Sequence, residues 1–216
     1  NLEQTTVVNE SGVETTSADW ARLYYDLIAS AAEAELVCFC GSLPPGSPLD
    51  AFTDLLRDLQ AMGKDVWVDA NGTALRAAAE IPGVHIKIND DEAATLLEAP
   101  IRDLSDAVAG ALALAQRLSA AAVITLGKRG AVMSDGAAVW HALHPPIKAK
   151  SAVGSGDSFL AGLLVGLQLG DKPSLALSRG VAAGSANALT IGGGHFALDD
   201  YQRILANTAI ILQKTG

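Results

Sequence analysis

A short segment of this chain, Gly154-Ser155-Gly156-Asp157, combines two glycines with a carboxylate. The apolar run over 159–169 that follows predicts a helix, so both glycines fall on its N-terminal turn. Free backbone N–H groups and the helix dipole favour an anion there, and glycine lets a phosphate approach the backbone closely. Asp157 would repel a phosphate but is well placed to accept a proton. The segment therefore predicts a phosphoryl-transfer site, with an ordinary helix cap as its plain alternative.

Two other segments place polar residues where predicted strands end. Asn89 and Glu92 lie three residues apart at the start of a predicted helix, so both face one side of it. An amide and a carboxylate in this position suit a hydrated Mg²⁺, although simple helix capping explains the same spacing. The segment 125–130 is a strand end followed by a turn with two glycines, for which an ordinary β-turn is the alternative.

The elements that position these residues alternate between short apolar strands and longer helices. Strands are predicted over 35–40, 65–69, 85–88 and 122–126, and helices over 20–32, 48–63, 73–80, 90–97 and 104–119. Asp135-Gly136 predicts a hairpin between 131–134 and 137–142, and three helices follow over 157–169, 174–189 and 198–213. Ser17 is the expected cap of the first helix. This order predicts an α/β fold with a mostly parallel central sheet, covered by helices on both faces, and an antiparallel hairpin near one edge.

The strand ends share a pattern that points to a single site. Glycines and polar side chains recur at Gly41-Ser42, Asn89, Gly127 and 154–157. Ligands of a parallel sheet bind beyond the carboxyl ends of its strands, so we expect these residues to converge. This convergence disfavours the interpretation in which every motif is only a cap or a turn.

Composition excludes several classes of protein. A chain of 216 residues fits one domain of ordinary size, and no apolar run approaches the ~20 residues of a membrane span. Asp and Glu outnumber Lys and Arg by 24 to 15 without a basic cluster, so neither nucleic acid nor a membrane is an expected partner. Cys38 and Cys40, the only cysteines, are predicted to be reduced core residues, which favours a reducing, cytoplasmic location.

The common nucleotide-binding fingerprints do not fit. Phe159 stands where a dinucleotide motif that starts at Gly154 requires its third glycine. Ser47 stands where a P-loop that starts at Gly41 requires lysine, and the His-Arg-Asp loop of protein kinases is absent. The four histidines are scattered along the sequence and form no Cys/His metal spacing.

Together, however, the motifs resemble those of the ribokinase-like carbohydrate kinases, in particular the phosphofructokinase B branch that phosphorylates sugar phosphates. The matching segments are 41–46 (Gly-Ser-Leu-Pro-Pro-Gly), 87–92 (Lys-Ile-Asn-Asp-Asp-Glu), 125–130, 153–157 and 181–186, in an order that fits nearly all 216 residues. The resemblance implies a three-layer α/β/α fold, with residues 1–16 as a remnant of a β lid and 17–216 as a nucleotide-binding core. Relatives carry about one hundred further residues upstream, which implies that this chain holds the nucleotide half and an incomplete sugar site.

The resemblance also implies roles for individual residues. Asp157 would deprotonate the acceptor hydroxyl and contact the substrate. Gly154, Ser155 and Gly156 would stabilise charge on the transferring γ-phosphoryl group of ATP. Ser42 would bind the phosphate already on the substrate. The residues implied in nucleotide binding are Lys87, Asn89, Thr125, Gly127, Gly130, Val181 and Ser185.

Two metal sites are implied as well. Asn89 and Glu92 would hold Mg²⁺ through water, and a monovalent cation such as K⁺ would lie beside the anion hole. The residues implied for the monovalent cation are Ser151, Val153, Asn187, Thr190 and Gly192. The sequence departs from the family pattern at Ile88, where proline is usual, at Ser155, where alanine is commoner, and at Gly194, where some relatives carry arginine.

The expected function is therefore an ATP- and Mg²⁺-dependent phosphosugar kinase, of the 1-phosphofructokinase or tagatose-6-phosphate kinase type. Its acceptor would be fructose 1-phosphate, fructose 6-phosphate or tagatose 6-phosphate. Two alternatives stay open at this point: a kinase of an unphosphorylated sugar or nucleoside, and a nucleotide-binding fragment without turnover. Relatives often dimerise through the lid, so a homodimer is also implied.

Overall fold

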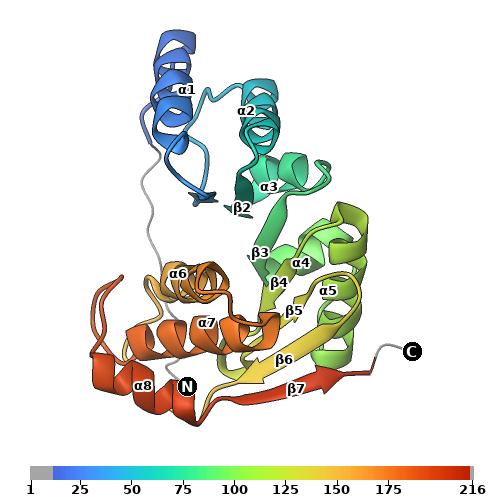
Figure 1. Cartoon of the computed structure of the whole chain (residues 1–216), viewed down its shortest axis with the longest axis vertical. Coiled ribbons are helices and arrows are strands. Elements are labelled where there is room, and N and C mark those ends of the chain that lie inside the picture. The colour runs from blue at the N-terminus through green and yellow to red at the C-terminus, as the bar shows by residue number, and fades with distance from the viewer. Residues whose placement is uncertain (1–11, 215–216) are drawn as a thin grey trace.

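The structure is a computed structural model that describes residues 12–214. It contains one seven-stranded sheet whose strands follow one another in chain order (Figure 1). The first four strands are parallel and the last three add antiparallel neighbours. The strands are β1 (Leu36–Cys40), β2 (Asp65–Asp69), β3 (His85–Asn89), β4 (Ala122–Thr125), β5 (Ala131–Ser134), β6 (Val139–Leu143) and β7 (Ala209–Gln213).

Helices cover both faces of the sheet, which confirms the predicted α/β/α layers. One apolar cluster joins one face of the sheet to α1 (Ser17–Ala31), α2 (Leu49–Ala61), α3 (Gly72–Ala78), α4 (Asp90–Leu97) and α5 (Leu104–Leu118). A second cluster joins the other face to α6 (Ser155–Gln168) and α7 (Pro173–Ala188). The last helix, α8 (Leu198–Ala206), packs against α7 (Figure 1). Successive side chains of β3 point to opposite faces of the sheet. Ile86 and Ile88 belong to the first cluster, and Lys87 between them points to the other face.

Glycines bring α6 and α7 unusually close together. A Cβ at Gly162 would lie 2.7 Å from the carbonyl oxygen of Arg179, and one at Gly184 would lie 2.8 Å from the carbonyl oxygen of Ser155. Any side chain at these two positions would therefore push the helices apart. The close packing fixes the N-terminal turn of α6 against α7, and that turn carries the motif with which the sequence argument began.

The structure corrects three details of the sequence-based prediction. Residues 209–213 form β7 rather than the end of a helix, since α8 ends at Ala206. The N-cap of α1 is Thr16 and not Ser17, because the Thr16 hydroxyl accepts the N–H of Asp19 in a capping box. Cys38 and Cys40 are free as predicted but exposed rather than buried, because they lie on β1, the edge strand of the described sheet.

The predicted lid remnant at 1–16 falls mostly outside the described residues, and its last five residues belong to neither a helix nor a strand. Among residues 12–214, no helix combines the length and the apolar character needed to cross a membrane.

Candidate active site

The carboxyl ends of β1 to β4 lie at one edge, because these four strands are parallel neighbours. On the face toward α6, Cys40 at the end of β1 pairs in register with Asp69 at the end of β2. The backbone N–H of Gly41 donates to the carbonyl of Asp69 at 2.8 Å. This bond ties the turn that carries Ser42, an exposed residue, to the same edge.

The glycine–carboxylate motif forms the N-terminus of α6. Gly154 is the N-cap and has a φ of +74°, in the left-handed region that favours glycine. A Cβ at Gly154 would lie 2.6 Å from the Cα of Gly193, so the two backbones are in direct contact. Asp157 lies in the first helical turn with an exposed side chain. The Ser155 N–H donates to the carbonyl of Ala152 at 3.1 Å. The next N–H groups of the first turn have no acceptor four residues back, which leaves them available to an anion.

A buried ion pair lies beneath this turn. The Nζ of Lys87 is 2.6 Å from Oδ2 of Asp69, and the two side chains are only 7% and 14% exposed. The same Nζ is 3.0 Å from the position that a Cβ would take on Gly156. An ammonium group, backbone N–H groups and a helix N-terminus therefore converge on one point, immediately beside Asp157.

Asp69 belongs to this cluster although the sequence argument does not single it out. Burial raises the pKa of the Asp69 carboxyl, the charge and hydrogen bond of Lys87 oppose that rise, and the charge of Asp157 adds to it. The two carboxyl groups therefore share one electrostatic environment. The sequence signal that could have identified Asp69 is its place, as a carboxylate at the last position of a buried parallel strand.

Asn89 and Glu92 form a capping box at the start of α4. The Oδ1 of Asn89 accepts the backbone N–H of Glu92 at 2.8 Å, and the Oε2 of Glu92 accepts the N–H of Asn89 at 2.9 Å. Helix capping is the alternative to a metal site that the three-residue spacing of Asn89 and Glu92 leaves open. Capping and an outer-sphere metal role are compatible, because Oε1 of Glu92 can still accept a hydrogen bond from the water of a hydrated Mg²⁺.

A magnesium ion at this place would need ligands from outside the protein. Among residues 12–214, no three His, Cys, Asp or Glu side chains gather in an arrangement that could hold a metal ion. Mg²⁺ commonly keeps several waters and takes further oxygens from substrate phosphates. The oxygen donors present therefore fit a hydrated ion carried in with a nucleotide.

The turn that follows β4 lies against the start of α4. The hydroxyl of Thr125 donates to a carbonyl of β3 at 3.3 Å. Gly127 and Gly130 bracket a short 3₁₀ turn, and Arg129 within it forms an ion pair with Asp90 at 2.9 Å. The turn is thereby fixed beside the capping box at the carboxyl edge of the sheet.

Two residues implied in nucleotide binding have little open surface. Val181 is 3% exposed and Ser185 is 8% exposed, and both lie on α7. Val181 belongs to the apolar cluster beneath α6 and α7. In the described structure these two residues line packed interior rather than an open pocket.

The residues implied for a monovalent cation gather around Asn187. The Ser151 hydroxyl accepts the N–H of Val153 at 3.2 Å, and the carbonyl of Val153 accepts from Nδ2 of Asn187 at 2.7 Å. The hydroxyl of Thr190 lies 2.9 Å from the carbonyl of Asn187, and Gly192 follows in a glycine-rich loop. The hydroxyl and carbonyl oxygens of this set keep lone pairs beyond these hydrogen bonds, so the set would suit a cation held by oxygen donors.

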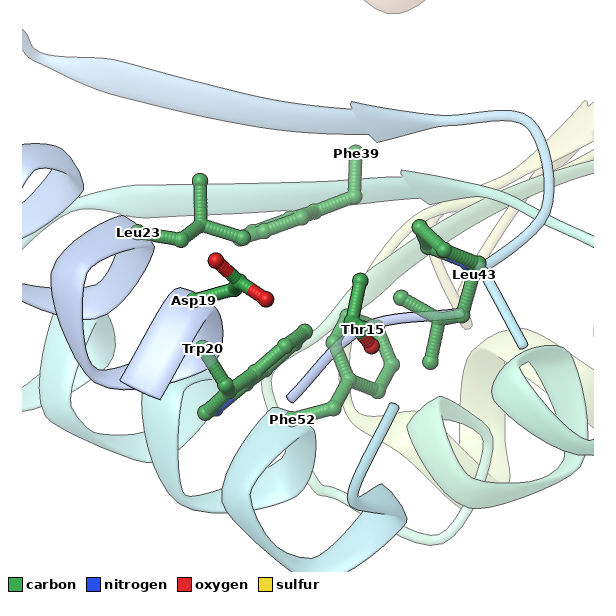
Figure 2. Close-up of a pocket in the computed structure, with 8 residues that line it drawn as sticks. Thr15, Asp19, Trp20, Leu23, Phe39, Leu43 and Phe52 are labelled. Carbon is green, nitrogen blue, oxygen red and sulfur yellow. The ribbon is translucent and has the colours of Figure 1, made fainter. Parts of the chain in front are cut away.

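The larger of two described cavities lies beside β1 but on the opposite face from Asp69. It has a volume of about 290 Å³ and is lined mainly by apolar side chains, as Figure 2 shows for Trp20, Leu23, Phe39 and Phe52. A smaller cavity of about 250 Å³ touches Glu92 and the start of α3. The chemistry-bearing residues thus lie at an open sheet edge rather than in the larger enclosed space.

Comparisons with known proteins point to one family. The sequence profile described as "pfkB family carbohydrate kinase" matches residues 2–200. The 1-phosphofructokinase of Escherichia coli K12 is 31% identical over 191 residues, which cover 88% of this chain and 61% of that protein. The ATP-dependent 6-phosphofructokinase isozyme 2 of the same organism is 34% identical over 175 residues, or 79% of this chain and 56% of that protein.

Solved structures give the same result. Phosphofructokinase-2 from Escherichia coli, in a crystal structure described as a complex with potassium, superposes with a TM-score of 0.86 at 29% identity. That match covers 92% of this chain and 64% of the other chain. The chain thus spans about three-fifths of the length of the curated relatives it matches. Motifs, fold and comparisons lead to one assignment: the chain belongs to the pfkB family of carbohydrate kinases.

Proposed function

We propose that the whole protein transfers the γ-phosphoryl group of ATP to a hydroxyl of a phosphorylated ketohexose, with Mg²⁺. The candidate acceptors are fructose 1-phosphate, fructose 6-phosphate and tagatose 6-phosphate. One observation carries the proposal: the Lys87 ammonium lies against Gly156 under the first turn of α6, and Asp157 stands beside it. This arrangement pairs an anion-binding point with a proton acceptor, which are the two requirements of phosphoryl transfer to an alcohol.

In this proposal Asp157 takes the proton of the acceptor hydroxyl. The hydroxyl oxygen forms a bond to the γ-phosphorus while the bond from that phosphorus to the β-phosphate oxygen breaks, and ADP leaves with the electron pair. N–H groups of the first turn of α6 and the Lys87 ammonium stabilise negative charge on the transferring group. Bound Mg²⁺, held through water by Asn89 and Glu92, would neutralise charge on the nucleotide phosphates.

The turn after β1 supports a phosphorylated acceptor. Its Gly41 N–H bonds to Asp69, so Ser42 is held at the edge that carries Lys87 and Asp157. A hydroxyl and backbone N–H groups in such a turn suit a phosphate oxygen. The names of the two curated relatives, a 1-phosphofructokinase and a 6-phosphofructokinase, support the same acceptor class.

The decisive experiment replaces the base. Asp157→Asn should lower kcat by about 100-fold or more, since general-base catalysis contributes 10²–10⁴. Nucleotide affinity should be kept or increased, because the substitution removes a negative charge beside the phosphate. Asp65→Asn is the matched control, as Asp65 is an exposed carboxylate at the opposite end of β2. Normal turnover in Asp157→Asn would overturn the assignment.

A substrate panel separates this proposal from its alternatives. The three ketohexose phosphates are compared with ribose and adenosine in a coupled assay of ADP release. Turnover confined to ribose or adenosine would indicate a kinase of unphosphorylated acceptors. Nucleotide binding by calorimetry without turnover of any acceptor would indicate a nucleotide-binding protein.

A further inference from the structure

The side chain of Asn187 is the most completely engaged polar group near the proposed anion hole. It lies near the C-terminal end of α7 and is fully buried, with 0% exposure. Its Nδ2 donates to the carbonyl of Val153 at 2.7 Å and to the hydroxyl of Ser155 at 3.1 Å. Its Oδ1 accepts the backbone N–H of Gly194 at 2.9 Å. An asparagine amide has two N–H donors and a carbonyl acceptor, so each N–H and the oxygen has a partner.

These bonds connect two loops that touch. A Cβ on Gly154 would lie 2.6 Å from the Cα of Gly193 and 2.8 Å from the N of Gly194. The loop before α6 and the glycine loop after α7 therefore meet backbone to backbone at the N-cap of α6. Neither loop carries a bulky side chain at this contact. Asn187 bonds to both loops, on one side through its N–H groups and on the other through its oxygen.

We propose that Asn187 is a positioning residue that clamps the N-terminal turn of α6 in its anion-binding geometry. This inference rests on the proposed function. Asn187 acts through Val153, Ser155 and Gly194 and does not itself touch the transferring group. Its side-chain oxygen accepts the N–H of Gly194, so the observed bonds of Asn187 all go to protein groups. Ser155 extends the clamp, because its hydroxyl gives Asn187 a second acceptor that alanine would not supply.

The first test is a double-mutant cycle on turnover. Asn187→Leu keeps the approximate volume but removes all three hydrogen bonds, and it should lower kcat about 100-fold, the order expected for a misplacement near 1 Å. Ser155→Ala removes one partner. Because Asn187 and Ser155 share a bond, the effect of Ser155→Ala on kcat should shrink in the Asn187→Leu background. Additive effects, or an unchanged kcat with only a lower melting temperature, would overturn the clamp.

The matched control is Ser178→Ala. Ser178 is also buried on α7, but its hydroxyl bonds locally to the carbonyl of Ser174. This variant should leave kcat unchanged even where it lowers the melting temperature. Potassium chloride provides a second control. If saturating KCl restored the kcat of Asn187→Leu, Asn187 would act as a cation ligand and the clamp would be wrong.

A readout without turnover keeps the inference separate from the proposed function. The N–H of Ser155 donates to Ala152 at 3.1 Å and that of Ser158 donates to Gly154 at 2.9 Å, so both amides report the order of this turn. Their hydrogen exchange should accelerate about tenfold or more in Asn187→Leu and not in Ser178→Ala. Unchanged exchange would refute the clamp, whether or not any sugar phosphate is a substrate.

Discussion

At the scale of single residues, the site is organised by shared electrostatics rather than by isolated motifs. Lys87 is predicted from the sequence as a phosphate contact, but its partner Asp69 is not. Spacing identifies residues within one segment, whereas the Lys87–Asp69 pair joins two strands whose register exists only in the folded sheet. The same holds for Asn187, whose bonds reach residues 34 and 32 positions away.

Cys38 and Cys40 allow a prediction about pH at this scale. The hydrogen bond donated by the Cys40 thiol lowers the pKa of Cys38 to about 6, against opposing effects of burial and of the Asp69 and Asp157 charges. A lowered pKa means that the thiolate already predominates at pH 7. We expect Cys38 to react with iodoacetamide at pH 7, with a half-maximal rate near pH 6.

The matched variants test the cause of that reactivity. Cys40→Ala removes the donor, so the midpoint for Cys38 should move upward and its rate at pH 7 should fall about tenfold. In Cys38→Ala, the remaining Cys40 should react slowly at pH 7. Mass spectrometry after timed alkylation measures both rates. Equal rates for Cys38 with and without Cys40 would contradict the hydrogen-bond explanation.

At the scale of elements, local sequence signals predict most of the architecture. Asp65–Asp69 and Asp90–Leu97 agree with the structure residue for residue. The prediction is wrong for 209–213, where apolar residues after α8 are assigned to the helix although they form β7. Ile210 and Ile211 are β-branched and Asn207 ends the helix, so a strand signal is present. Pairing with β6 decides the outcome, and that contact is not local.

Gly154 allows a prediction about how an element begins. Its φ of +74° is nearly that of Gly63, at +75°. Of these two glycines, Gly154 has backbone atoms within 3 Å of the position that a Cβ would take, and Gly63 has no atom within 4 Å of it. Gly63→Ala should cost about 1–2 kcal/mol of unfolding free energy, the usual penalty of the left-handed region. Gly154→Ala should cost about 1–3 kcal/mol more, because the methyl group collides with Gly193 and Gly194. Urea denaturation of both variants measures the difference. Equal losses of unfolding free energy would show that the loop at Gly193 and Gly194 moves aside for the methyl group at little cost.

At the scale of the whole molecule, the proposed phosphate-binding edge lies on a chain of formal net charge −9. Near the site, Lys87 and Arg129 are balanced by Asp69 and Asp90 in ion pairs, and Asp157 is exposed. In the proposed function, a polyanionic nucleotide would therefore meet an overall repulsive field at long range, and attraction would begin only near the N-terminus of α6. Charges separated by more than about 8 Å are largely screened at physiological ionic strength.

This balance predicts an uncommon salt dependence for the proposed nucleotide. The association rate constant of a Mg²⁺-bound, non-hydrolysable ATP analogue should rise about twofold or more between 10 mM and physiological ionic strength, since salt screens the long-range repulsion first. Dissociation should change less, because the contacts to Lys87 and the α6 turn are short and partly shielded. Stopped-flow binding at several salt concentrations measures both constants. An association rate that falls with salt would mean that the local positive field of Lys87 and α6 extends beyond the acidic surface.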